Sequence, residues 1–353
     1  MESIYEVTAR ITPPDEAARA AARARWDALA KPLGSLGEFE EMIAKIAALR
    51  GTAELSLSRR CLLVFCADNG VLARGVSQCG SDVTAKVAAA LAGGRSTVSP
   101  MARLANCRVL PVDVGMLDFP GMEGVLNLRV RNGTADISRG PAMTRGECLR
   151  AMAAGAALAG KLAGEGEALL LIGEMGIGNT TTAAAVTAAL LGLDPDAVTG
   201  RGAGLSDAGL ARKRQAVAEA LAVNRPDPDD PVDVLTKVGG LDLAAMCGAF
   251  LGAAAGRAGA VADGMISAAA ALCALRLCPA AGKALLGSHI SAEPAGERLI
   301  RALGLRPPIR AGLRLGEGSG AVALLPLLDM ALAVYGSGQT FDRLGIEAYV
   351  PQN

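Results

Sequence analysis

The sequence predicts an α/β protein in which helices flank a buried parallel sheet. Three short apolar runs, residues 61–67, 109–112 and 169–172, are each followed closely by an acidic residue and a glycine. Continuous apolar runs of this length are typical of strands that are covered on both faces. A capping box at Thr144 and Glu147 opens a helix before the third run, and a strand–helix–strand order predicts a right-handed crossover.

Composition supports a large globular core and excludes several classes of partner. Of the 353 residues, 51% are hydrophobic and 20% are charged, and Lys+Arg and Asp+Glu both total 35. A formal charge of zero gives no general attraction to nucleic acid or to an anionic membrane, so we expect neither as a partner. The first 30 residues contain no apolar signal segment, and the apolar run at 321–334 is interrupted by Pro326 and Asp329. We therefore expect a cytoplasmic protein without a membrane span.

Cysteine and histidine are too sparsely placed for a metal centre. The eight cysteines form no Cys-x-x-Cys pair, and His289 is the only histidine. We expect no metal and no cofactor, and we interpret the cysteines as buried thiols. His289 lies near the end of a predicted strand, where a core or capping role is favoured over a catalytic one.

Two helices precede the first strand. The first follows Pro13-Pro14-Asp15 and reaches about residue 30, and an amphipathic helix spans residues 38–50. The pattern predicts a small helical domain over residues 1–55, completed by residues of the C-terminal helix, and a large α/β domain over 56–353. Lys31 and Ser35, in the loop between the two helices, are either ordinary loop residues or a gate over a site.

The chain is organised around residues 169–182, which predict a strand, a tight loop and a helix N-terminus. We expect Gly173, Gly176 and Gly178 to let the backbone turn and approach a ligand closely, and Asn179 or Thr180 to cap the helix. Such a terminus binds anions. The spacing is close to that of a nucleoside-triphosphate loop, but Asn179 stands where that loop needs lysine, which favours a monophosphate. The alternative is a glycine turn without a ligand.

A second glycine-rich loop, residues 200–204, precedes a helix that carries Arg212, Lys213 and Arg214. Three consecutive side chains point in three directions, so one or two of them can face a common ligand. The alternative is a solvated basic turn. Farther on, Asp263 ends a weak predicted strand, and Glu317 stands between two glycines ahead of a long apolar helix, where it is open to approach.

Seven motifs along nearly the whole chain resemble nicotinate-nucleotide:dimethylbenzimidazole phosphoribosyltransferases. They are Lys31-Pro-Leu-Gly-Ser-Leu-Gly, Ala67-Asp-Asn-Gly-Val with Gly75-Val-Ser, Gly133-Thr with Gly140-Pro-Ala-Met-Thr, Gly173-Glu-Met-Gly-Ile-Gly-Asn-Thr-Thr, Gly200-Arg-Gly-Ala-Gly, Ser288-His-Ile-Ser-Ala-Glu-Pro and Arg314-Leu-Gly-Glu-Gly-Ser-Gly. The resemblance implies a homodimer with a Rossmann-like sheet and a smaller helical domain. It implies transfer of 5-phosphoribose from nicotinate mononucleotide to 5,6-dimethylbenzimidazole or a related lower-ligand base, giving α-ribazole 5′-phosphate and nicotinate for cobamide assembly.

The resemblance also implies roles for individual residues. Glu317 matches the family's catalytic glutamate, a base that accepts the N–H proton of the incoming azole. Glu174 and Asp263 would stabilise positive charge on the ribosyl ring or hold its hydroxyl groups. The expected substrate-binding residues are Gly176, Gly178, Asn179, Thr180, Gly202 and Gly204 with Lys213 at the 5′-phosphate, Ser291 and Arg314 near the nicotinate carboxylate, and Asp68, Ser77 and Gln78.

The sequence departs from the family pattern around the base pocket. Many members carry histidine where Asn69 stands, an aromatic-proline pair where this chain has Gln78-Cys79-Gly80, and alanines at Arg95 and Ser96. A purine or a phenol therefore remains an alternative acceptor. Two further alternatives are a non-catalytic subunit that pairs with an active homologue, and a dinucleotide-binding oxidoreductase. The second lacks a Gly-x-Gly-x-x-Gly directly after the first strand.

Overall fold

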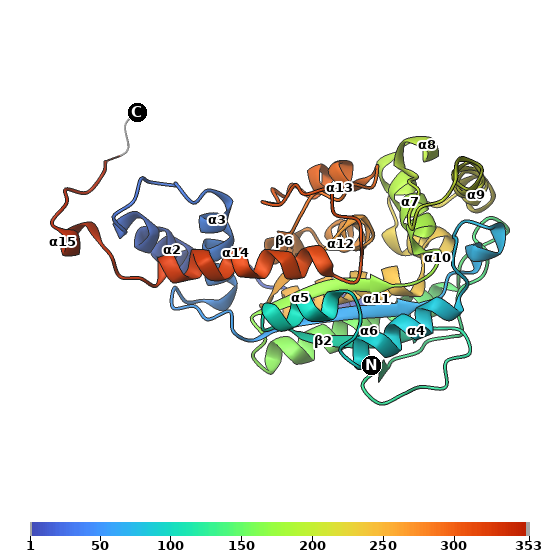
Figure 1. The fold of residues 1–353 in the computed structure, drawn as a ribbon, viewed down its shortest axis with the longest axis horizontal. Helices are drawn as coiled ribbons and strands as arrows, with labels where there is room; N and C mark the ends of the chain where they lie inside the picture. The colour runs from blue at the N-terminus through green and yellow to red at the C-terminus, as the bar shows by residue number, and fades with distance from the viewer. Residues whose placement is uncertain (1, 351–353) are drawn as a thin grey trace.

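A six-stranded parallel sheet forms the centre of the protein (Figure 1). The computed structural model describes residues 2–350, and within them the strand order is β3-β2-β1-β4-β5-β6, with every neighbouring pair parallel. The strands are β1 (Arg60–Ala67), β2 (Arg108–Gly115), β3 (Leu126–Asn127), β4 (Leu169–Met175), β5 (Gly259–Ala262) and β6 (Leu285–Gly287). This is a Rossmann-like order, and it confirms the predicted fold class.

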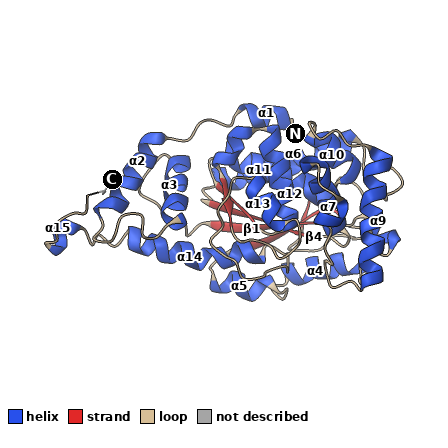
Figure 2. Ribbon diagram, turned by 90° about the horizontal axis from the view of Figure 1, so that it is seen from above, coloured by secondary structure: helices blue, strands red, loops and turns tan. Residues whose placement is uncertain are grey.

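Helices supply the connections and the covering layers (Figure 2). They are α1 (Ile4–Ala9), α2 (Glu16–Ala28), α3 (Glu38–Arg50), α4 (Asp82–Ala92), α5 (Val98–Leu104), α6 (Arg145–Gly164), α7 (Asn179–Leu191), α8 (Pro195–Val198), α9 (Asp207–Asn224), α10 (Pro231–Val238), α11 (Leu241–Ala255), α12 (Met265–Leu277), α13 (Gly296–Ala302), α14 (Ser319–Tyr335) and α15 (Phe341–Leu344), with 3-10 helices η1 (Gly70–Arg74) and η2 (Pro279–Lys283). None of the helices in the described part of the chain has the length and apolar character that a bilayer crossing requires.

The sheet is buried on both faces, as its apolar strands predict. Leu63 and Phe65 of β1 belong to a hydrophobic cluster that contains α6, α7, α11 and α12. Leu62 and Val64 belong to a second cluster with α3, α5 and α14. Side chains alternate between the faces of a strand, so a run without polar residues requires this double cover.

The strand order changes direction between β1 and β4, which places a crevice at their carboxyl ends. Phe65 pairs with Glu174 and Cys66 with Met175, so both strands end at the same edge. Ligands of open α/β sheets bind at this position. The polar residues that follow the strands are therefore gathered there by topology.

Helices α2 and α3 form a smaller group at one end of the elongated molecule, where α14 runs alongside them (Figures 1 and 2). The ring centroids of Trp26 and Tyr335 lie 5.0 Å apart, and the Arg25 guanidinium lies 4.5 Å from the Tyr335 centroid. The Tyr335 hydroxyl also donates to the Ala53 carbonyl at 2.8 Å. Helix α14 is therefore anchored to this group by its last residue.

Two local expectations need correction. Gly178, with φ of 96°, is the N-cap residue of α7, whereas the Asn179 side chain turns back to donate to Glu174. Helix α1 was not expected before the Pro13-Pro14 pair, although Ser3 and Glu6 form a capping box.

Candidate active site

A cavity of 280 Å³ lies at the carboxyl edge of the sheet. Its walls come from the loop after η1, the β4–α7 loop, the loop at 202–203, and the segments that follow β5 and β6 and precede α14. It brings together most of the residues that the sequence singled out, namely Ser77, Glu174, Gly176, Gly178, Asn179, Thr180, Gly202, Asp263, Ser291, Arg314 and Glu317. Residues from distant parts of the sequence thus share one site.

The glycines of the β4–α7 loop permit close packing within the protein. A Cβ on Gly173 would lie 2.7 Å from the Gly318 nitrogen, and one on Gly176 would lie 2.4 Å from the Ala67 oxygen. The near neighbours are therefore other parts of the chain, not an approaching ligand as the sequence suggested. The close contact at Gly173 also holds the loop that carries Glu317 against β4, the strand that carries Glu174.

Two loops present backbone donors beside a buried lysine. Within the described residues, the N–H groups of Gly178, Thr180, Gly202 and Ala203 donate to no backbone oxygen. The Lys213 ammonium donates to the Thr180 hydroxyl at 2.8 Å and so joins the two loops. Free N–H groups at a helix N-terminus with a nearby cation form an anion site.

Of the three consecutive cations, Lys213 is the one that lies directly behind the two loops, where it donates to Thr180. The Arg212 guanidinium lies 3.5 Å from the Gly75 oxygen, and the Arg214 guanidinium lies 3.9 Å from Asp196. Lys213 is 1% exposed, and burial lowers its pKa to about 8, an effect that the nearby Glu293 carboxylate opposes. A solvated basic turn is therefore excluded for Lys213.

Glu174 is a buried carboxyl group among other acids. Burial raises its pKa to about 8, the Asp242 carboxylate adds to the increase, and the hydrogen bond from Asn179 opposes it. Burial likewise raises the pKa of Asp242 to about 6. Glu174 is consequently protonated at neutral pH when the cavity holds no cation. A cationic substrate group placed beside it would favour the ionised form.

Glu317 is held in an unusual backbone conformation. Its φ is 57°, in the left-handed region that glutamate rarely adopts, and glycines with φ of 87° and 76° flank it. One carboxylate oxygen accepts the Val98 N–H at 3.2 Å, and the side chain lines the cavity. Left-handed backbone costs a residue other than glycine on the order of 1–2 kcal/mol, so the surrounding fold imposes this conformation.

His289 and Asp263 meet at the ends of β6 and β5. The Asp263 carboxylate accepts the Ala321 N–H at 2.9 Å, and His289 Nδ1 lies 3.0 Å from the Ser288 hydroxyl. Burial raises the pKa of Asp263 and lowers that of His289, and the attraction between the two groups opposes both shifts. His289 lines the cavity, although its sequence position had favoured a core or capping role.

Four residues expected at the site lie outside the cavity lining. Lys213 and Gly204 stand behind it, and the Gln78 amide donates to the Ala203 oxygen at 3.2 Å, which supports the loop. Asp68 has a structural role instead. Its carboxylate accepts the Thr84 hydroxyl at 2.6 Å and the Leu117 N–H at 2.8 Å, so each of its oxygens already has one donor.

Sequence reasoning gave no role to Glu293 or Asp242. Glu293 lines the cavity and carries a buried oxygen without a hydrogen-bond partner in the described residues. Asp242 is fully buried, and a Cβ on Gly176 would lie 2.7 Å from its carboxylate. Glu293 stands in one of the seven motifs, which was the only available signal. Asp242 is brought to the site by the start of α11, and no local pattern marks it.

The sequence and the fold match one enzyme family. A phosphoribosyltransferase family profile matches residues 11–346. The chain belongs to this family. It is 43% identical to the nicotinate-nucleotide–dimethylbenzimidazole phosphoribosyltransferase of Ruminiclostridium cellulolyticum over 330 residues, 94% of each chain. It is also 43% identical to the enzyme of that name from a Roseiflexus species over 351 residues, 99% of each chain.

A solved structure of the same kind shares the fold. The crystal structure of CobT from Thermus thermophilus aligns with a TM-score of 0.88 at 42% identity, covering 94% of this chain and 100% of that chain. The resemblance seen in the seven motifs is thereby confirmed, as is the enzyme class, a phosphoribosyltransferase. Membership also removes the oxidoreductase alternative.

Proposed function

We propose that this phosphoribosyltransferase moves 5-phosphoribose from nicotinate mononucleotide to 5,6-dimethylbenzimidazole or a related lower-ligand base. The products are α-ribazole 5′-phosphate and nicotinate, used in assembling the nucleotide loop of a cobamide. The observation that carries the proposal is the presence of two features in one cavity. An anion site between two glycine loops suits the 5′-phosphate, and a glycine-flanked carboxylate, Glu317, suits the proton of the incoming base.

The donor would be fixed at three places. Its phosphate accepts from the N–H groups of Gly178, Thr180 and Gly202 and from Lys213. Its nicotinate carboxylate lies toward Ser291 and Arg314, both in the cavity wall. The pyridinium and the ribosyl ring then lie near Glu174 and Asp263, where the positive charge lowers the pKa of Glu174 and stabilises its carboxylate form.

In the transfer step, an azole nitrogen forms a bond to C1′ while the bond from C1′ to the pyridinium nitrogen breaks. The electrons of the breaking bond stay on that nitrogen, so nicotinate leaves as a neutral pyridine ring and needs no general acid. Positive charge would accumulate on the attacking azole. Glu317 accepts the N–H proton at the other azole nitrogen and prevents this.

The wall available to the base is largely apolar. Val76 and Cys79 come from the segment after η1, Val83 comes from the first turn of α4, and Met265 and Ile266 belong to the start of α12. A flat aromatic ring suits such surfaces, and methionine adapts to its shape. Cys79 stands in the segment that departs from the family pattern, so we propose that this segment sets which base is accepted. A purine or a phenol is the second candidate acceptor.

We further propose a homodimer, which is also what the seven motifs imply. Helix α14 carries Met330, 59% exposed, and Val334, 40% exposed, with Leu327 one turn before. An apolar stripe on a helix is a common feature of subunit interfaces. Sedimentation of the protein with Met330→Glu and Val334→Glu should show monomers, whereas the unmodified chain sediments as a dimer. A monomeric unmodified chain would rule the homodimer out.

The compartment and the domain division are also proposals. All eight cysteines are free thiols, which supports a reducing compartment, the cytoplasm. The contacts of α2 and α3 with each other and with the end of α14, at one end of the molecule, support a small helical domain over residues 1–55, completed by C-terminal residues, and a large domain over 56–353.

The direct test incubates the purified chain, without any homologue, with nicotinate mononucleotide and a panel of benzimidazoles, purines and phenols. Mass analysis should detect a ribazole phosphate and an equal amount of nicotinate. Formation of the product by the chain alone excludes a purely non-catalytic subunit. No product with any base, from folded protein, would overturn the proposal.

A further inference from the structure

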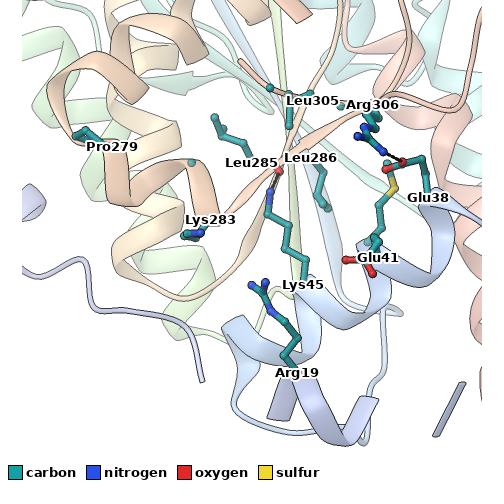
Figure 3. A pocket seen from close by; sticks show the side chains of 14 residues that line it. Arg19, Glu38, Glu41, Lys45, Pro279, Lys283, Leu285, Leu286, Leu305 and Arg306 are labelled. Atoms are coloured by element: carbon teal, nitrogen blue, oxygen red, sulfur yellow. Dashed lines mark hydrogen bonds and ion pairs between the residues drawn. The ribbon is translucent and has the colours of Figure 1, made fainter. Parts of the chain in front are cut away.

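A second and larger cavity lies between the α2–α3 group and the edge strand β6 (Figure 3). Its volume is 560 Å³, within the range of small-molecule sites, and it shares no lining residue with the candidate active site. One wall comes from α2 and α3. The other comes from η2, β6 and residues 304–306. The catalytic scheme uses none of these residues.

Basic side chains converge on this cavity. Arg19 and Lys45 project from the helices, and Lys283 and Arg306 approach from the opposite wall (Figure 3). Lys45 is mostly buried, and its ammonium donates to the Leu285 carbonyl of β6. That bond uses one of its three protons, so two remain available to a ligand.

The acidic residues in the wall are already engaged. The Glu41 carboxylate accepts two hydrogen bonds from Arg23, at 2.8 and 3.1 Å. Glu38 lies 3.5 Å from the Arg306 guanidinium. No carboxylate of the described residues pairs with Lys45 or Lys283. The partly buried Lys45 and the exposed Lys283 therefore line one open cavity without a carboxylate partner.

The electrostatics agree with this geometry. Burial lowers the pKa of Lys45 to about 8, and the positive charges of Arg19 and Lys283 act in the same direction. Arg19 and Lys283 thus both act on Lys45, although burial has the larger effect. An unpaired cation held in a wall is costly to the fold, and a bound anion would remove that cost.

We propose that this cavity is a second ligand site, which binds a small phosphate ester through Lys45, Lys283 and Arg19. A phosphate dianion matches the charges of the two lysines, and its oxygens accept from lysines and from the planar Arg19 fork. The Arg19 Nε lies 3.4 Å from the Glu16 carboxylate, which leaves the two terminal guanidinium nitrogens for this role. The remaining volume accommodates the organic part of the ester against Met42, Leu286 and Leu305.

The ligand would bridge two parts of the fold. Arg19 and Lys45 belong to the helical group, and Lys283 belongs to the sheet side. Strand β6 lines the cavity and continues directly into Ser288 and His289. Occupancy of the site should therefore stabilise the protein against unfolding as well as give a binding signal.

The test titrates the full-length protein with inorganic phosphate and with glycerol 3-phosphate at constant ionic strength. Lysine amines carry ¹³C-methyl labels, and the Lys45 resonance is assigned by its loss in Lys45→Met. We expect bound phosphate to raise the pKa of Lys45 by at least one unit. Titration with glycerol 3-phosphate should shift the Lys45 resonance along a saturating binding curve. Succinate, a dicarboxylate of equal charge, should bind at least tenfold more weakly.

Variants separate this site from the active site. Lys283→Met keeps the Lys45 signal and should weaken phosphate binding at Lys45 at least tenfold. Lys86→Met removes an exposed lysine that pairs with Asp82, and it should change nothing. Lys213→Met, behind the candidate active site, should also leave the Lys45 response intact. An unchanged Lys45 pKa at saturating phosphate, or equal binding by Lys283→Met, would overturn the proposal.

Discussion

We expect the Lys213 ammonium to bind the phosphate of the donor. The variant Lys213→Met removes the charge and keeps most of the packing of the side chain. The side chain is 1% exposed, and one ammonium proton is already donated to Thr180. Two protons remain for the donor's phosphate. A hydrogen bond to a charged partner contributes about 1.5–3 kcal/mol, which corresponds to about a 10- to 150-fold change in binding. Methionine occupies a space similar to that of the lysine side chain but carries no charge.

We expect the KM for nicotinate mononucleotide to rise by about this factor in Lys213→Met, while the KM for the base stays nearly constant. The control is Arg214→Met, which removes the next cation on α9 but leaves the cavity unchanged. Lys213→Met should also melt at a higher temperature than the unmodified chain, because it removes a buried cation whose pKa burial has lowered to about 8. Reduced activity with increased stability would distinguish a binding role from a structural one.

The pH profile gives a second readout of the same group. Below pH 8 the free enzyme carries a charged Lys213, and above pH 8 it progressively loses that charge. The kcat/KM for the mononucleotide should therefore fall above about pH 8 in the unmodified chain and lose that fall in Lys213→Met. An unchanged KM for the mononucleotide, or a change confined to the base, would refute the assignment of Lys213 to the phosphate.

Two further predictions concern the β4–α7 loop. Gly178→Val places a side chain at φ of 96° with its Cβ 3.1 Å from that of Asn69, so calorimetry should show a large loss of mononucleotide affinity. Nicotinate riboside, which has no phosphate, should bind weakly and nearly equally to both proteins, and a preserved preference for the mononucleotide would count against the phosphate site. Glu174 has a folded-state pKa of about 8, above its unfolded value, so the native state retains a proton that the unfolded chain releases and stability falls as pH rises toward 8. In denaturant unfolding, the free energy of unfolding should therefore fall less steeply with pH in Glu174→Gln than in the unmodified chain, by up to about 1.4 kcal/mol per pH unit over that window. Parallel pH profiles of the two proteins would show that Glu174 is ionised in the free protein.

Local signals in the sequence were sufficient for the sheet and for most of the site. Apolar runs that end in polar residues specify buried parallel strands, and parallel strands deliver those residues to one edge. Glu174 could be found in this way, whereas Glu317 was found from its flanking glycines and from the resemblance to the family. The glycines marked a close approach correctly, but the sequence does not say what approaches. The structure shows that Gly173 faces backbone and that Gly176 faces backbone and Asp242.

The residues that sequence reasoning missed depend on tertiary packing. Asp242 reaches the site because α11 begins beneath the loop at Gly176, and no spacing rule relates those positions. His289, a lone histidine near a predicted strand end, was expected to have a core or capping role; it is buried, yet it lines the cavity. For Asp68, which the resemblance implied at the substrate, no signal in the sequence indicated that Thr84 and the Leu117 N–H donate to its carboxylate.

Turnover of Glu317→Gln with dimethylbenzimidazole tests the proposed chemistry most directly. Glutamine keeps the shape and the contact with the Val98 N–H but cannot accept the proton. A general base contributes about 10²- to 10⁴-fold, so kcat should fall by that factor while calorimetry shows unchanged mononucleotide binding. With an azole methylated at its remote nitrogen, which has no proton to lose, the difference between the two proteins should shrink. Near-normal turnover by a folded Glu317→Gln protein would contradict the role of Glu317 as the base.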